Sequence, residues 1–111
     1  MANQKSVDET FIVLTTELNG AIAEGLAKEL LNRKLAACVN LREVSSYFTW
    51  KGEIEQTNEV QLLIKTSKSR LENLLDTVAK LHSYQTPELL YWSALASDAY
   101  QEWINNSVSH D

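Results

Sequence analysis

The chain has 111 residues, of which 44% are hydrophobic and 23% are charged, and its formal net charge is −5. This length predicts a single domain, and the low glycine and proline content excludes collagen-like and disordered classes. No apolar run approaches the roughly 20 residues that span a bilayer, so no membrane partner is expected. Basic residues are scattered, so nucleic acid is not an expected partner either. A single cysteine and a polar N-terminus without a signal-peptide pattern indicate a cytoplasmic protein.

The first half of the chain predicts a strand, a helix and a second, longer strand. Residues 9–17 (ETFIVLTTE) form a continuous β-branched and aromatic run, which is typical of a strand buried on both faces. Residues 21–34 carry apolar side chains at i, i+4 and i+8, which predicts an amphipathic helix. Residues 36–50 have no helical stripe and predict a strand.

The middle of the chain predicts a hairpin and then a second helix. Lys51 and Gly52 indicate a tight turn, and residues 53–66 alternate between apolar and polar as a returning strand does. The second helix is expected to be capped by Ser67, or by Ser69 with a capping box to Glu72. It should end near residues 82–84, because the residue before Pro87 disfavours helix.

The last part of the chain predicts a strand and a short helix. Residues 88–96 form a second continuous apolar run, and Ser97 or Asp98 can cap a terminal helix whose Tyr100, Trp103 and Ile104 face inward. The order βαββαβ plus a helix is that of an α+β, ferredoxin-like sandwich, in which helical crossovers are expected to pair parallel strands. We expect one domain over residues 9–106, with flexible segments at residues 1–8 and 107–111.

The predicted hairpin is too long for the domain. Strands of about 14 residues would reach about 45 Å, whereas a compact domain of this length has a radius of gyration of about 13 Å. The hairpin should therefore project as an arm with Tyr47, Phe48 and Trp50 near its tip, and exposed edges and aromatic side chains favour association into a homo-oligomer. The alternative is a bulge that folds the hairpin back onto its own domain.

Common catalytic and metal-binding motifs are absent from the sequence. Three glycines do not build a phosphate-binding loop, and there is no CxxC, HExxH or EF-hand spacing. The only candidate imidazole bases are His82 and the terminal His110, so nucleophilic catalysis is not expected and we predict a non-enzymatic protein.

A set of polar and aromatic residues could still form a site. Most of these residues have a structural alternative: Cys38 in the core, Trp50 as an interface anchor, an ion pair between Glu59 and Lys65, His82 as a helix cap, and Tyr84 as a residue that shapes the turn. Tight metal sites need three or four ligands, and one chain offers one cysteine and one non-terminal histidine, so such a site must recruit carboxylates or a second subunit. The candidate residues are Cys38, Tyr47, Trp50, Glu59, Lys65, His82, Tyr84 and Glu88.

Four motifs make the sequence similar to a known family. They are KLAACVN (34–40), YFTWKGEIEQTNEVQLLIKT (47–66), LHSYQTPELL (81–90) and AYQEWI (99–104). Through them the chain resembles the CutA divalent-cation tolerance family over nearly its whole length. The resemblance implies a ferredoxin-like subunit, a homotrimer bridged by hairpin arms, and binding of divalent cations, chiefly copper. An alternative, by analogy of fold with PII-type proteins, is a signalling trimer that binds a small effector at subunit clefts, with Lys65 as counter-charge to an anion.

The resemblance also implies roles for individual residues. His82 falls on the histidine of the family motif H-x-Y-x-x-P-E and is the implied ligand for a divalent metal such as Cu²⁺ or Zn²⁺. Thr15, Leu81 and Thr77 stand where some members carry cysteine or histidine, which weighs against a copper–thiolate site. Cys38 lies in the AACVN motif and is implied to be a core residue. The residues implied to line a cleft between subunits are Trp50, Glu59, Lys65, Tyr84 and Glu88.

Overall fold

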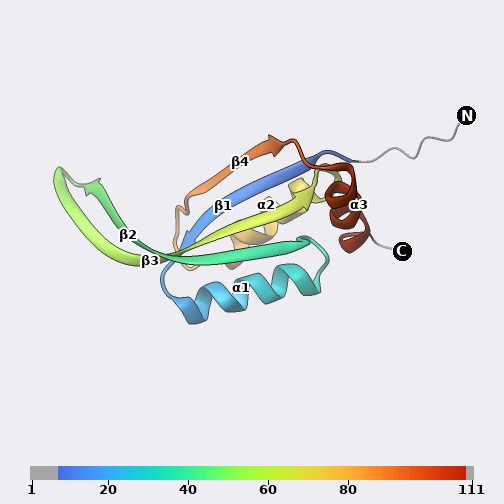
Figure 1. Cartoon of the computed structure of the whole chain (residues 1–111). Helices are drawn as coiled ribbons and strands as arrows, with labels where there is room; N and C mark the ends of the chain where they lie inside the picture. Colours follow the sequence, from blue (N-terminus) through green and yellow to red (C-terminus); the bar gives the residue numbers. More distant parts are fainter. Residues whose placement is uncertain (1–7, 110–111) are drawn as a thin grey trace, which may run out of the picture.

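A computed structural model describes residues 8–109 of the chain (Figure 1). The described part has the predicted order βαββαβα. The elements are β1 (Thr10–Glu17), α1 (Gly20–Asn32), β2 (Cys38–Trp50), β3 (Glu53–Ser67), α2 (Lys68–Leu81), β4 (Leu89–Ala94) and α3 (Asp98–Ser107). The expected flexible ends lie largely outside the described residues. At the C-terminal side, α3 runs through Ser107 and Val108 is buried, beyond the boundary expected at residue 106.

The four strands form one sheet in the order β2-β3-β1-β4, and each neighbouring pair is antiparallel. The expectation that the helical crossovers pair parallel strands is therefore wrong. The helix α1 joins β1 to β2, which run in the same direction but are separated by β3. In this sheet β3 pairs with β2 through the tight hairpin and with β1 on its other side, so it lies between the two strands that α1 connects.

The core lies between the sheet and the helices α1 and α2. Alternation along the central strands points Val13 of β1 and Val60, Leu62 and Ile64 of β3 to this face, where all four are buried. The two helices cover it with their apolar stripes, from which Ala23, Leu26, Ala27, Leu30, Leu74 and Val78 join the same cluster. The opposite face of the sheet receives neither α1 nor α2, and we call it the open face.

Local signals explain where the helices begin. The side chain of Asn19 accepts a hydrogen bond from the Ile22 amide at 2.9 Å and caps α1. Ser97 does the same for α3. The expected side-chain cap of α2 is wrong: Ser67 is the N-cap residue but makes no capping hydrogen bond, and Ser69 lies inside the helix. Ser67 is also the last residue of β3 and is fully buried there, and its hydroxyl has no hydrogen-bond partner among the described residues.

The strand β4 is an edge strand, and the expectation that it is buried on both faces is wrong for the single chain. Leu90, Tyr91 and Trp92 are between 44% and 53% exposed, because the sheet order leaves β4 with β1 as its one neighbour. The expected inward face of α3 is also only partly right. Ile104 is fully buried, whereas Tyr100 and Trp103 stack on each other at the surface with ring centroids 5.5 Å apart.

The hairpin projects as predicted. Its pairing runs without a break from Cys38 opposite Lys65 to Trp50 opposite Glu53, so the alternative of a bulge that folds it back is wrong. Lys51 and Gly52 both have positive φ, 52° and 81°, as a two-residue I′ turn requires. Because β1 ends opposite Val60, residues 44–59 have only each other as strand neighbours, and we call them the arm. The arm extends beyond β1 and β4 and makes the molecule 60 Å long and 24 by 21 Å across (Figure 1).

Among residues 8–109, no helix combines the length and the apolar character needed to cross a membrane.

Candidate functional site

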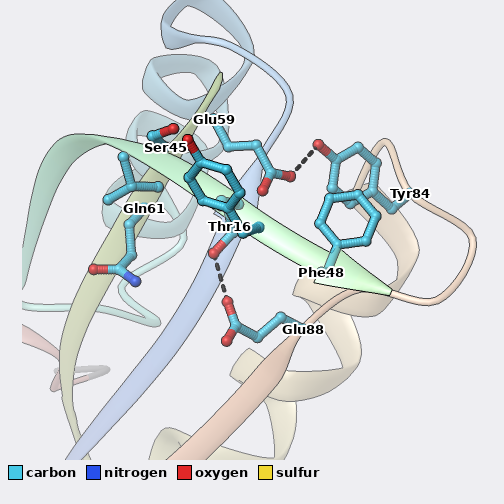
Figure 2. Close-up of a pocket in the computed structure, with 10 residues that line it drawn as sticks. Thr16, Ser45, Phe48, Glu59, Gln61, Tyr84 and Glu88 are labelled. Atoms are coloured by element: carbon cyan, nitrogen blue, oxygen red, sulfur yellow. Dashed lines mark hydrogen bonds between the residues drawn. The ribbon is translucent and has the colours of Figure 1, made fainter. Parts of the chain in front are cut away.

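A pocket of about 430 Å³ lies where the arm leaves the sheet (Figure 2). The end of β1 contributes Thr16, β3 contributes Glu59 and Gln61, and residues 44–48 of β2 form one wall. The remaining side comes from the segment between α2 and β4 and its junction with β4, which supply Tyr84 and Glu88. The pocket thus collects side chains from four parts of the chain that are distant in sequence.

Both pocket carboxylates are held by hydroxyl donors. The Tyr84 hydroxyl donates to Oε2 of Glu59 at 2.5 Å, and the Thr16 hydroxyl donates to Oε1 of Glu88 at 2.5 Å, as the dashed lines in Figure 2 show. The pKa of the Tyr84 phenol lies well above its usual value of 10.0, first because the group is partly buried. The hydrogen bond to Glu59 and the negative charges of Glu59 and Glu17 raise this pKa further.

His82 lies behind this pocket with its side chain fully buried. Its Nδ1 accepts a hydrogen bond from the Tyr84 amide at 3.0 Å, so Nδ1 carries no proton in this geometry and Nε2 is the protonated nitrogen. Nε2 lies 3.1 Å from the Thr15 hydroxyl, which in turn donates to the Glu88 carbonyl at 2.7 Å. Both ring nitrogens are therefore occupied by protein groups, and a metal ion at His82 would have to replace one of them.

Glu17 is a buried carboxylate at the end of β1 that the sequence analysis did not single out. It accepts hydrogen bonds from the Leu18 amide at 3.0 Å, from the Ser83 amide at 3.0 Å and from the Ser83 hydroxyl. Its Oε2 is 3.5 Å from Nδ1 of His82, but this contact is not an ion pair because that nitrogen already accepts from Tyr84. Burial raises the pKa of Glu17, but its hydrogen bonds outweigh burial and leave that pKa below the ordinary value of 4.5. The sequence signal that could have pointed to Glu17 is a charged residue at the end of a strand that is predicted to be buried.

The charge of the pocket favours a cation. Its lining includes the carboxylates Glu59 and Glu88 and no lysine, arginine or histidine, so an anion would meet like charge. Carboxylate and hydroxyl oxygens are the donors that hard divalent cations prefer. Within residues 8–109 no three His, Cys, Asp or Glu side chains are grouped as a metal site, so a cation here would complete its coordination with hydroxyls, water or another chain.

Comparison with known proteins identifies the family. The family model described as CutA1 divalent ion tolerance protein matches residues 11–107. The divalent-cation tolerance protein CutA of Salmonella newport (strain SL254) is 40% identical over 105 residues, which cover 93% of this chain and 91% of that protein. The chain belongs to the CutA1 divalent-ion tolerance family.

Solved CutA structures share the fold. The chain matches CutA from Synechococcus elongatus PCC7942 with a TM-score of 0.89 and 31% identity, over 92% of each chain. It matches the periplasmic divalent cation tolerance protein CutA from Archaeoglobus fulgidus with a TM-score of 0.86 and 33% identity, over 90% of this chain and 99% of that one. The shared fold therefore covers at least nine-tenths of this chain and of each of these CutA chains.

The structure places only some of the eight candidate residues in the pocket. It brings together Tyr47, Glu59, Tyr84 and Glu88. Cys38 and Lys65 are partners across β2 and β3 near the other end of the sheet, where the Lys65 ammonium lies 6.0 Å from the ring centroid of Tyr100 in α3. Lys65 therefore neither pairs with Glu59 nor lines the pocket.

Trp50 lies at the tip of the arm and is 61% exposed. One chain thus assembles three of the five residues expected to line a cleft, and a cleft between subunits stays a prediction.

Proposed function

We propose that the chain is a non-enzymatic protein that binds divalent cations in the pocket at the base of the arm. The observation that carries this proposal is the pair of carboxylates, Glu59 and Glu88, that reach one pocket from different parts of the fold without a basic side chain beside them. The tolerance role of the family makes Cu²⁺ and Zn²⁺ the first cations to test. Because no basic side chain lines this pocket, no specific observation favours the alternative of a PII-like site for an anionic effector.

The geometry around His82 supports a non-enzymatic role. The Ser83 hydroxyl donates to Glu17 rather than to the imidazole. The Thr15 hydroxyl donates to the Glu88 carbonyl, while the protonated Nε2 of His82 faces Thr15. A nucleophilic hydroxyl must instead donate to an unprotonated ring nitrogen, so this arrangement does not activate either hydroxyl.

We further propose that the functional unit is a cytoplasmic homotrimer of ferredoxin-like subunits. Three features support self-association. The open face carries Leu90 and Trp92, which are 51% and 44% exposed. Both β2 and β4 are edge strands with one neighbour each. The arm carries exposed apolar side chains, among them Tyr47 and Ile54.

Isothermal titration calorimetry tests the cation site. Zn²⁺ and Cu²⁺ are titrated into the wild type and into Glu59→Gln, Glu88→Gln and His82→Ala. Glu72→Gln is the matched control, because Glu72 is exposed on α2 and does not line the pocket. We expect the two pocket variants, Glu59→Gln and Glu88→Gln, to bind each cation about tenfold or more weakly, since each loses one charged ligand. The control should bind like the wild type. Unchanged binding in both pocket variants would reject the pocket, and a loss confined to His82→Ala would place the metal at the imidazole.

A further inference from the structure

The segment of residues 82–88 carries two of the pocket's polar side chains but belongs to no helix or strand. It connects the end of α2 at Leu81 to the start of β4 at Leu89. Tyr84 and Glu88 both come from it. Something other than regular backbone pairing must therefore hold this segment in place, since the orientation of Tyr84 and Glu88 depends on it.

The end of β1 holds this segment at two points. Thr15 donates to the Glu88 carbonyl and lies next to Nε2 of His82. Two residues further along the same face, Glu17 accepts from both the amide and the hydroxyl of Ser83. The next amide, that of Tyr84, donates to Nδ1 of His82. The consecutive amides of Ser83 and Tyr84 are thus each bound by a side-chain acceptor. These two hydrogen bonds fix the backbone at Tyr84 and so the direction in which its side chain points.

The carboxylate of Glu17 can be buried only while the segment is docked. Its side chain has no solvent exposure, and an ionised carboxylate removed from water is costly unless hydrogen bonds compensate it. Two of the three donors that it accepts from belong to Ser83. Undocking of the segment would leave the charge with the Leu18 amide alone, so the burial of Glu17 favours the docked position strongly.

We propose that Glu17 is a positioning residue of the cation pocket, which acts through Ser83 to place the Tyr84 hydroxyl against Glu59 and to aim Glu88 into the pocket. The predicted effect on cation affinity rests on the proposed function, whereas the predicted effect on the position of Tyr84 does not. Glu17 contacts no proposed ligand directly. The bond that it helps to place, from Tyr84 to Glu59, spans two elements and therefore reports whether the segment is docked.

The test compares Glu17→Gln and Ser83→Ala with the wild type. Glutamine keeps the shape of Glu17 but offers one accepting oxygen instead of two, so it cannot satisfy the three donors from Leu18 and Ser83. Ser83→Ala removes only the hydroxyl and is the milder variant. Ile104→Val is the control for a purely structural loss, because it trims a fully buried side chain of α3, at the other end of the sheet.

Two readouts are recorded on each variant. The first is the set of nuclear Overhauser contacts between the Tyr84 ring and the Glu59 methylenes in metal-free protein, and the second is the Zn²⁺ affinity by calorimetry. We expect Glu17→Gln to lose the ring contacts and to bind Zn²⁺ about tenfold or more weakly. Ser83→Ala should shift both in the same direction, and Ile104→Val should change neither.

The outcomes separate this proposal from the proposed function. Retained Tyr84–Glu59 contacts in both Glu17→Gln and Ser83→Ala would overturn the positioning role, whatever the metal data show. Lost contacts with unchanged Zn²⁺ affinity would overturn its link to the cation pocket. Lost contacts in a protein whose wild type binds neither Zn²⁺ nor Cu²⁺ would support the positioning role and reject the proposed function.

Discussion

Trp92 offers the sharpest test of self-association. It lies on the open face opposite Ile12 of β1 and is 44% exposed in the single chain. A tryptophan side chain can bury about 250 Å², so about 110 Å² of Trp92 is left for a partner. At about 25 cal/mol per Å², burial of this area stabilises an assembly by about 2.8 kcal/mol per chain. Trp92→Ala should therefore weaken association by about two orders of magnitude for each chain that contributes this contact.

Sedimentation equilibrium over a range of micromolar concentrations measures this effect. The matched control is Leu81→Ala, since Leu81 is 45% exposed but lies at the end of α2, on the other side of the sheet. We expect the wild type and Leu81→Ala to sediment as the same oligomer and Trp92→Ala to dissociate at higher concentrations. A wild-type monomer, or equal dissociation of Trp92→Ala and Leu81→Ala, would refute the reasoning.

Three further predictions concern stability. The pKa of Glu17 is lower in the folded state than its ordinary value of 4.5, so ionised Glu17 stabilises the fold above pH 4.5, and this contribution is lost as the pH falls through the folded-state pKa. The difference in melting temperature between wild type and Glu17→Gln should therefore narrow in acid. A difference that stays constant with pH would contradict this. Because the pKa of Tyr84 is raised in the folded state, its contribution to stability is lost as the pH rises above 10. In a series of thermal melts at increasing pH, the melting temperature of Tyr84→Phe should fall less than that of the wild type. Leu62 is fully buried in β3, so Leu62→Ala should lower the unfolding free energy by about 2–5 kcal/mol in denaturant titrations, and a loss below about 1 kcal/mol would contradict the assigned core.

The sequence was sufficient for the elements and for the arm, because both depend on local patterns. The alternation over residues 53–66 and the positive-φ turn at Lys51 and Gly52 specify a hairpin without reference to the rest of the chain. Its length alone exceeds what a compact domain can cover, which is why the projection could be expected. The motif positions likewise pointed to Glu59, Tyr84 and Glu88, which the fold gathers in one pocket.

The tertiary structure alone decided which strand lies at an edge and how the site is held. A continuous apolar run such as β4 indicates that both faces need cover, but it does not say whether the same chain or another copy supplies that cover. Glu17 and Ser83 are 66 residues apart, and no local pattern relates a buried carboxylate to the amides that will compensate its charge. Hydrogen bonds of this kind depend on where two segments meet in space, whereas strand and helix periodicity depends on near neighbours in the chain.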